Sequence, residues 1–418
     1  MININKFKKI IIYLFFIIVI IILILAFSSS YRSFNIDNLA FVIALGIDKG
    51  SNDGNLQITL QIAKPSAISE TGSSKESDSY VINSVEASSI STAINLMNSY
   101  IGKELNLSHC KLIVFSEEVA VGGISKELYT LMNNLEIRPY TNMVVSKTGA
   151  KYYIENSKPS LEVLPSKYYE IFPNSSKYTG YTSNATIGDF FNNMKSNTSE
   201  GYSILGGAID GDLSVLGKYS STNPIDSGNI KSNETSISGK RGAENIGLAV
   251  FKDDKLVGEL NAIETICFSI IHNEVDGFLI TIENPEDEES YIDLYLYHDS
   301  NSKCDVDIIN GNPYITINCK LDGRIYSMKN NAEYLNNDVL DKISSYASNY
   351  MKLQMSNYLY KTSKDFKSDI NGFGKFALSN FTTINEFERY NWLYNYENAF
   401  FNVNMDISIK SGLLLVET

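Results

Sequence analysis

The stretch Leu39-Ala-Phe-Val-Ile-Ala-Leu-Gly-Ile47 is apolar throughout and is followed by the polar residues Asp48-Lys49-Gly50. Its length and its branched residues are typical of a strand buried on both faces, and the polar boundary indicates a turn. Leu56 to Ala63 alternates apolar and polar residues, which predicts a half-buried strand in a hairpin with the first. The folded part of the chain is therefore expected to open with a sheet.

Helical spacing follows this sheet and then alternates with strands. Ile90, Ile94, Met97 and Ile101 fall on one face of a predicted helix that starts near Glu86 and ends at Gly102. The next predicted elements are a strand at Lys111–Phe115, a helix through Ile124, Leu128 and Leu131, a strand at Met143–Ser146 and a short helix that starts at Thr186. Alternating strands and helices predict an α/β domain with a mixed sheet.

Two segments rich in small polar residues are predicted to be exposed. Pro65 to Ser79 has nothing to bury and reads as a solvated loop, and Ser220 to Gly242 reads as a long loop or linker. Asp210-Gly211-Asp212 is expected to be a hairpin turn between two strands, since it lacks the later carboxylates of a calcium loop.

The residue pattern of the C-terminal half indicates a second domain. A hairpin is expected from Gly247–Phe251 and Leu256–Leu260, and further period-two strands from Tyr291–Tyr297 and Tyr314–Asn318. A long amphipathic helix from about Asn337 to Tyr360 has an apolar face suited to cover these strands. The prediction is an antiparallel sheet covered by one long helix.

The N-terminus carries a membrane signal. Lys6, Lys8 and Lys9 precede an uncharged apolar run from Ile10 to Phe27. A helix of about 18 residues is about 27 Å long, which is just enough to span a bilayer. Basic residues on the N-terminal side orient that end toward the cytoplasm, so the chain from Tyr31 onward is expected outside it. The alternative is a cleaved secretory signal with small residues around Ala26-Phe27-Ser28, although this run is longer than most cleaved signals.

Charge, cysteines and histidines exclude several functions. The formal charge of −13 gives no basic surface for phosphates, so no nucleic-acid partner is expected. Cys110, Cys267, Cys304 and Cys319 lack CxxC spacing and nearby histidine pairs, so no zinc ribbon, other metal site or cofactor is expected. A Cys304–Cys319 disulfide across a predicted hairpin stays open, with buried free thiols favoured. The three histidines form no catalytic motif in the sequence.

Four blocks in order resemble the Ger(x)C family, the C subunits of the nutrient germinant receptors of spore-forming bacteria. The blocks are Asn38–Asp48; Leu107–Glu118 with Leu135–Arg138; Gly247–Gly258 with Glu264; and Lys367–Gly374 followed by Trp392 and Gly412. The family usually begins its mature chain with a lipidated cysteine and a tryptophan. Ser30-Tyr31 occupy that place here, so the Ile10–Phe27 helix is expected to replace the lipid.

Four residues within these blocks are candidates for interaction or structure: Asp48, Arg138, Glu264 and Trp392. Arg138 either contacts a partner subunit or pairs with a local carboxylate such as Glu136, the favoured interpretation. Glu264 either caps a helix start or bridges two domains. Trp392 either packs in the core, which is favoured, or anchors an interface.

The sequence thus predicts an α+β protein in three parts. An N-terminal transmembrane helix (1–30) is followed by a mixed-sheet α/β domain (31–262) and by a C-terminal domain of antiparallel sheet covered by a long amphipathic helix (263–418). The resemblance implies a non-enzymatic receptor subunit at the spore inner membrane, with the main domains extracytoplasmic and with A-type and B-type membrane subunits as partners. The alternative functions are an exported protein that binds a small ligand itself and, less favoured, a cell-wall hydrolase.

Overall fold

The computed structural model describes residues 4–28, 38–64, 79–158, 161–162, 165–208, 228–235, 242–328 and 337–410. The chain divides into two units, Met1–Leu39 and Ala40–Thr418. The predicted turn at Asp210-Gly211-Asp212, and all of the Pro65–Ser79 loop except Ser79, lie outside the described residues.

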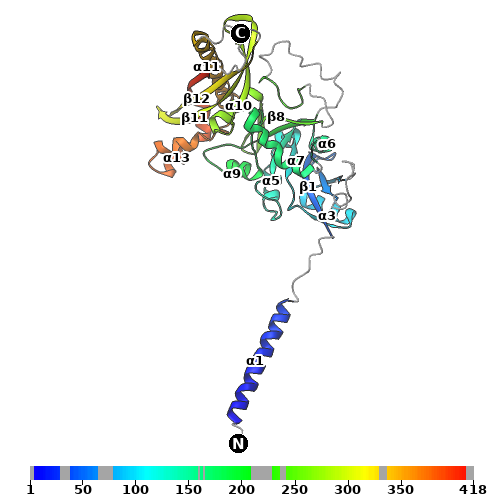
Figure 1. Cartoon of the computed structure of the whole chain (residues 1–418). Helices are drawn as coiled ribbons and strands as arrows, with labels where there is room; N and C mark the ends of the chain where they lie inside the picture. The colour runs from blue at the N-terminus through cyan, green and yellow to red at the C-terminus, as the bar shows by residue number, and fades with distance from the viewer. Residues whose placement is uncertain are drawn as a thin grey trace, which may run out of the picture. The chain divides into compact units, whose positions relative to one another are not determined.

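The first unit contains one described helix, α1 (Ile4–Ser28), drawn in blue in Figure 1. It includes the whole predicted apolar run from Ile10 to Phe27, and its side chains from Ile11 to Ile24 are exposed. Within the described ranges, none of the helices satisfies both the length and the apolarity that a membrane span requires.

The second unit contains a large mixed sheet. In chain order its strands are β1 (Leu39–Lys49), β2 (Leu56–Ala63), β3 (Tyr80–Ala87), β4 (Glu104–Asn106), β5 (Leu112–Ser116), β6 (Asn142–Ser146), β7 (Tyr202–Ala208), β8 (Ala243–Lys252) and β9 (Lys255–Leu260). Their order across the sheet is β3-β2-β1-β5-β6-β7-β8-β9, and β4 pairs with β1. The strands β1, β5, β6 and β7 run parallel, whereas β2–β3 and β8–β9 pair antiparallel on either side.

Helices cover both faces of this sheet. Neighbouring residues of β5 show the two faces: Ile113 and Phe115 belong to one core, and Leu112 and Val114 belong to another. The first core includes α3 (Ile90–Ile101), α4 (Glu117–Gly122), α5 (Ser125–Met132) and α9 (Ile187–Met194); the second includes α6 (Ala150–Asn156) and α7 (Pro165–Ile171). Burial on both faces explains why the central strands are apolar without alternation.

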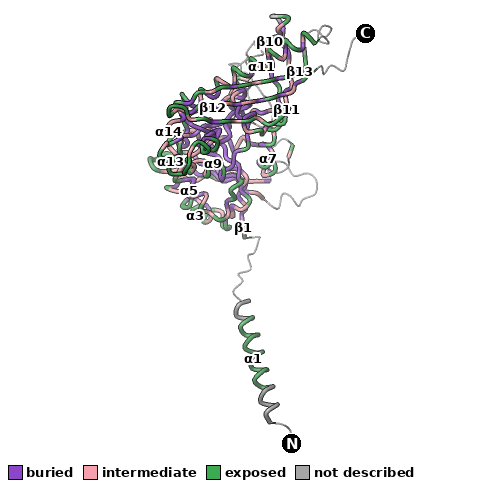
Figure 2. Tube along the Cα trace, turned by 90° about the vertical axis from the view of Figure 1, so that its left-hand side faces the viewer, coloured by how far each residue is buried: buried purple, intermediate pink, exposed green. Residues whose placement is uncertain are grey.

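A second sheet lies in the C-terminal half. It consists of β10 (Phe278–Asn284), β11 (Asp287–Ile309), β12 (Asn312–Met328) and β13 (Phe400–Lys410), in that order. The helices α10 (Ala262–His272) and α11 (Asn337–Tyr360) pack with it in one hydrophobic core. Figure 2 colours the chain by burial and labels the four strands of this sheet and α11. The bounds of α11 are those predicted from its spacing.

The prediction of a purely antiparallel second sheet is wrong at one edge. The strands β10, β11 and β12 pair antiparallel, but β13 pairs parallel with β12. A parallel neighbour requires a crossover connection, and α11 together with the short helices up to Asn398 provides it here. Both β13 and β3 were missed in the sequence, and β3 occupies residues where the first helix was expected to start.

Part of the predicted linker is buried, which corrects the expectation that Ser220–Gly242 buries little. Its residues 228–235 are described, and Ser232 is fully buried. The Ser232 hydroxyl donates to the Leu205 carbonyl at 2.8 Å and accepts from the Ile246 N–H at 2.6 Å. Short polar side chains bond well to backbone groups, so a polar composition did not mean an exposed segment here.

The four cysteines are free. Across the β11–β12 hairpin, Cys304 lies opposite Ile317 and not opposite Cys319. The Cys319 sulfur accepts a hydrogen bond from the Ser302 hydroxyl at 3.4 Å. The register of the hairpin therefore places the two thiols two residues out of line.

Candidate functional site

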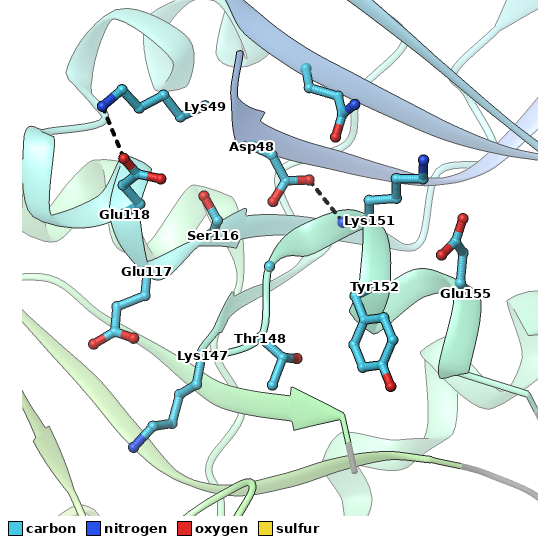
Figure 3. A pocket seen from close by; sticks show the side chains of 12 residues that line it. Asp48, Lys49, Ser116, Glu117, Glu118, Lys147, Thr148, Lys151, Tyr152 and Glu155 are labelled. Atoms are coloured by element: carbon cyan, nitrogen blue, oxygen red, sulfur yellow. Dashed lines mark hydrogen bonds and ion pairs between the residues drawn. The ribbon is translucent and has the colours of Figure 1, made fainter. Parts of the chain in front are cut away.

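The carboxyl ends of β1, β5 and β6 surround an open hollow of about 540 Å³ (Figure 3). In open α/β sheets this edge is where ligands bind, because the loops after parallel strands diverge there. The lining residues are Asp48, Lys49, Gln57, Ser116, Glu117, Glu118, Lys147, Thr148, Gly149, Lys151, Tyr152 and Glu155. The sequence candidate Asp48 is among them.

Asp48 joins the end of β1 to the start of α6. Its carboxylate accepts hydrogen bonds from the backbone N–H of Ala150 at 2.7 Å and of Lys151 at 2.8 Å. Gly149 precedes the helix with φ of +91°, and a Cβ there would lie 3.2 Å from the Asp48 Oδ1 atom. Burial raises the pKa of Asp48, although the two backbone hydrogen bonds oppose that shift. Asp48 therefore holds α6 in place.

Three of the charged residues that line the hollow with Asp48 form ion pairs: Lys49, Glu118 and Lys147. Lys49 makes an exposed ion pair with Glu118 at 2.9 Å. Lys147 and Lys231 both contact the Glu259 carboxylate, at 2.9 Å and 3.2 Å. Burial alone raises the pKa of Glu259, but the two lysines more than offset it and the pKa is lowered. These contacts tie the end of β6 and the 228–235 segment to β9.

The titratable side chains that line the hollow are carboxylates, lysines and one tyrosine. Its lining residues include neither a histidine nor a cysteine, the side chains that most often serve as a base or nucleophile at neutral pH. In the described part of the chain, no group of three or more His, Cys, Asp or Glu residues is arranged to hold a metal ion.

Glu264 has two structural roles. With Asn261 it forms a reciprocal capping box at the start of α10: Glu264 N–H donates to the Asn261 side chain at 2.9 Å, and Asn261 N–H donates to the Glu264 carboxylate at 2.8 Å. The same carboxylate forms an ion pair with Lys361 at 2.8 Å. The helix-capping interpretation from the sequence thus describes this residue, and Lys361 is a partner that the sequence did not reveal.

Trp392 lies in the core, 1% exposed. Its indole Nε1 donates to the Asp369 Oδ2 atom at 2.8 Å, and the backbone N–H groups of Phe373 and Gly374 donate to the same carboxylate. Burial raises the pKa of Asp369 to about 6, although these hydrogen bonds oppose the shift. Asp369 stands within the quoted Lys367–Gly374 block but was not singled out from the sequence.

Arg138 lies at the surface. It donates a hydrogen bond to the Tyr140 hydroxyl and sits 5.7 Å from the centre of that ring. The expected pairing with Glu136 is not formed, since the Glu136 carboxylate accepts from the Asn106 side chain and the Leu107 N–H. Arg138 and Tyr140, which is 57% exposed, form an exposed basic and aromatic pair.

The four candidates do not form one site. Asp48 lies at the edge of the first sheet, Glu264 starts α10, Trp392 is in the core of the second sheet, and Arg138 is exposed. The residues that hold them, among them Lys361 and Asp369, come from distant segments. Their spacing in the sequence gave no signal, because tertiary packing alone brings them together.

Comparison with known proteins gives a consistent result. A model described as "Spore germination protein N-terminal domain" matches residues 32–204, and one described as "Spore germination B3/ GerAC like, C-terminal" matches residues 246–412. A search of curated proteins finds no match.

A solved structure titled "Crystal Structure of the GerBC protein" has a similar fold. The TM-score is 0.53 over 88% of this chain and 97% of that chain, with 16% identity. The two matched models together extend over most of the chain, in the order that the family requires. This chain belongs to the Ger(x)C family of spore germinant receptor C subunits and has a role in spore germination.

Proposed function

We propose that this chain is a non-enzymatic, membrane-anchored subunit of a spore germinant receptor that docks on an A-type and a multi-spanning B-type subunit, so that nutrient binding is transmitted. The family match carries this proposal, because its two models cover most of Ala40–Thr418. We place the domain boundary at 262/263, in the first turn of α10 and just after β9.

Three of the candidate residues are hydrogen-bonded or ion-paired within the chain, which supports a structural role for them. Asp48 is bonded to the start of α6, Glu264 to Asn261 and Lys361, and Trp392 to Asp369. These bonds hold helix starts and a core segment in place. Arg138 and Tyr140 are instead exposed, which suits a contact with another subunit.

We also propose that α1 anchors the chain in the spore inner membrane with the main domains extracytoplasmic. The apolar run Ile10–Phe27 follows three lysines, and its side chains from Ile11 to Ile24 are exposed within α1. An acidic chain of formal charge −13 is repelled by anionic headgroups, which leaves the apolar helix as the membrane contact.

The anchor is tested by fractionation and intact mass. We expect the parent to be found with spore membranes and to keep its N-terminus. Ile17→Glu with Ile18→Glu should shift the chain to the soluble fraction, because charges at the centre of a span are costly. Ile17→Leu with Ile18→Leu is the matched control and should remain in the membrane. A soluble mature chain that starts at Ser29 would overturn the anchor.

Docking is tested by crosslinking in spore membranes. The parent should recover an A-type or B-type subunit, and Arg138→Glu with Tyr140→Ser should recover less of it while nutrient germination slows. Lys352→Glu, an exposed charge reversal on α11, serves as the control. Germination by a receptor-independent trigger should be unchanged. If crosslinking recovers neither subunit from the parent, the docking proposal is wrong.

A further inference from the structure

Two segments that are distant in the chain pack closely between the two sheets. Residues 198–201 lead into β7 of the first sheet, and residues 367–374 lead into α12 (Gly374–Ala377) in the core of the second. The Glu200 N–H donates to the Asp369 carbonyl at 2.9 Å. A Cβ on Gly374 would lie 2.5 Å from the Thr198 carbonyl oxygen, so the two backbones are in direct contact. Residues 198–201 and 367–374 thus form a seam between the sheets.

The turn between β8 and β9 is bonded to both sides of this seam. The Ser368 hydroxyl donates to the Phe251 carbonyl, and the Phe251 N–H donates to the Gly201 carbonyl at 3.1 Å. The Asp253 N–H donates to the Glu200 carboxylate at 2.8 Å. The carboxyl group of Glu200 therefore lies where three segments of the chain meet.

Two carboxyl groups are buried at the seam, and they differ in their hydrogen bonds. Asp369 is fully buried and accepts from the Trp392 indole and from the N–H groups of Phe373 and Gly374, all within the second-sheet core. Glu200 is 2% exposed, and among the described residues its carboxylate accepts a single hydrogen bond, from Asp253. A buried carboxylate with so few donors is costly, whereas its protonated form is not.

The charges that face Glu200 come from both neighbouring segments. Asp253 and Lys252 lie on the turn, and Asp369 lies across the seam. Burial raises the pKa of Glu200 to about 7, and the negative charges of Asp253 and Asp369 add to that shift. The Asp253 N–H and the positive charge of Lys252 oppose it. In the closed seam Glu200 therefore changes its charge near neutral pH.

We propose that Glu200 is a pH-sensitive switch: its neutral carboxyl keeps the seam closed, and its ionised carboxylate favours an open state in which residues 198–201 separate from residues 367–374. Opening hydrates the carboxylate while both sheets stay folded, as in other local openings of native proteins. Control of the chain's own conformation goes beyond the docking role proposed above and requires no other subunit.

The direction and the size of the effect follow from linkage. In the open state the hydrated carboxyl group titrates near its ordinary pKa of 4.5, and in the closed state its pKa is about 7. Between these values the closed state holds a proton that the open state has lost, so the opening constant rises with pH and levels off above about pH 7. From pH 5.5 to pH 7.5 the expected rise is about twentyfold.

The test is hydrogen exchange of the purified full chain in detergent micelles, followed by mass spectrometry over this pH range and corrected for the intrinsic exchange rate. The amides of Glu200 and Asp253 report on the seam, since their acceptors lie across it. The amides of β5 report on the opening of the first sheet. We expect the seam amides to open more readily than β5 at each pH, and their opening constant to rise about twentyfold.

Variants assign this change to Glu200. Glu200→Gln cannot ionise, and its amide oxygen still accepts the Asp253 N–H, so seam opening should change by less than about threefold. Asp369 keeps its donors when the seam opens, because they lie on its own side. Glu388→Gln removes an exposed carboxyl group on α13 (Ile384–Tyr390) and should open like the parent.

Three results would overturn the switch: seam opening that does not change with pH, equal opening constants at the seam and in β5, or an unchanged pH dependence in Glu200→Gln. The first two are measured on the parent alone, so they decide the proposal even where the variant does not fold. None of these results bears on docking, which is measured by crosslinking. The failure of one proposal is therefore distinguishable from the failure of the other.

Discussion

The indole Nε1 of Trp392 donates a 2.8 Å hydrogen bond to the carboxylate of Asp369 inside the core of the second sheet. The bond connects α14 (Trp392–Asn395) to the turn before α12, and both residues are almost fully buried. A buried carboxylate is stable only when its oxygens are bonded. This pair therefore fixes the chain segments that lead into β13.

Trp392→Phe should lower the free energy of unfolding by about 2 to 4 kcal/mol, because it leaves a cavity and removes a donor from a buried carboxylate. Chemical denaturation of the purified chain measures the change. Tyr394→Phe, two residues away and 65% exposed, is the control and should change stability little. Equal stability of the Trp392 variant and the parent would show that the Asp369 contact is dispensable.

The buried carboxyl group of Glu200 should make the stability of the protein depend on pH. It is 2% exposed, and burial raises its pKa to about 7 from an ordinary 4.5. The folded state therefore holds this proton more tightly than the unfolded state, so the contribution of Glu200 to stability is present below about pH 4.5 and is lost as pH rises through about 7. Asp369 acts in the same direction. His272, whose pKa burial lowers to about 4, acts in the opposite one.

Glu200→Gln isolates this effect, since the amide oxygen still accepts the Asp253 N–H. Near pH 8 the variant should be more stable than the parent by about 2 kcal/mol, and near pH 5 the difference should shrink. Unfolding curves at several pH values give the difference directly. A constant difference across this range would mean that Glu200 stays ionised.

Asp48→Asn tests the edge of the first sheet. The variant keeps one acceptor but turns an amide donor toward a backbone N–H of α6, so we expect a loss of about 1 to 2 kcal/mol in unfolding free energy. Glu118→Gln removes an exposed carboxylate from the same hollow and should have little effect. Hydrogen exchange at Ala150 and Lys151 should rise in the first variant alone, and unchanged exchange there would contradict the role given to Asp48.

Most of the elements that local signals in the sequence predicted are present in the structure. The run Leu39–Ile47, the αL cap at Gly102 and the spacing of Asn337–Tyr360 depend on contacts between near neighbours, and the structure has a strand and two helices there. The parallel pairing of β13 and the bonds of Ser232 depend on segments far away in the chain. Asp48 directly follows the Leu39–Ile47 run and could be named as a candidate. Its partners in α6 are distant in the chain, so they could not be predicted.

The cysteines give a last prediction. The structure has four free thiols, and the hairpin register separates Cys304 from Cys319. Burial raises the pKa of both Cys110 and Cys304 to about 12, so very little reactive thiolate exists at neutral pH. In the folded chain a maleimide should therefore label slowly. In denaturant without reductant, intact mass should show four labels per chain, and a prior reduction step should add none. Two labels that rise to four after reduction would instead mean that Cys304 and Cys319, or another pair, form a disulfide.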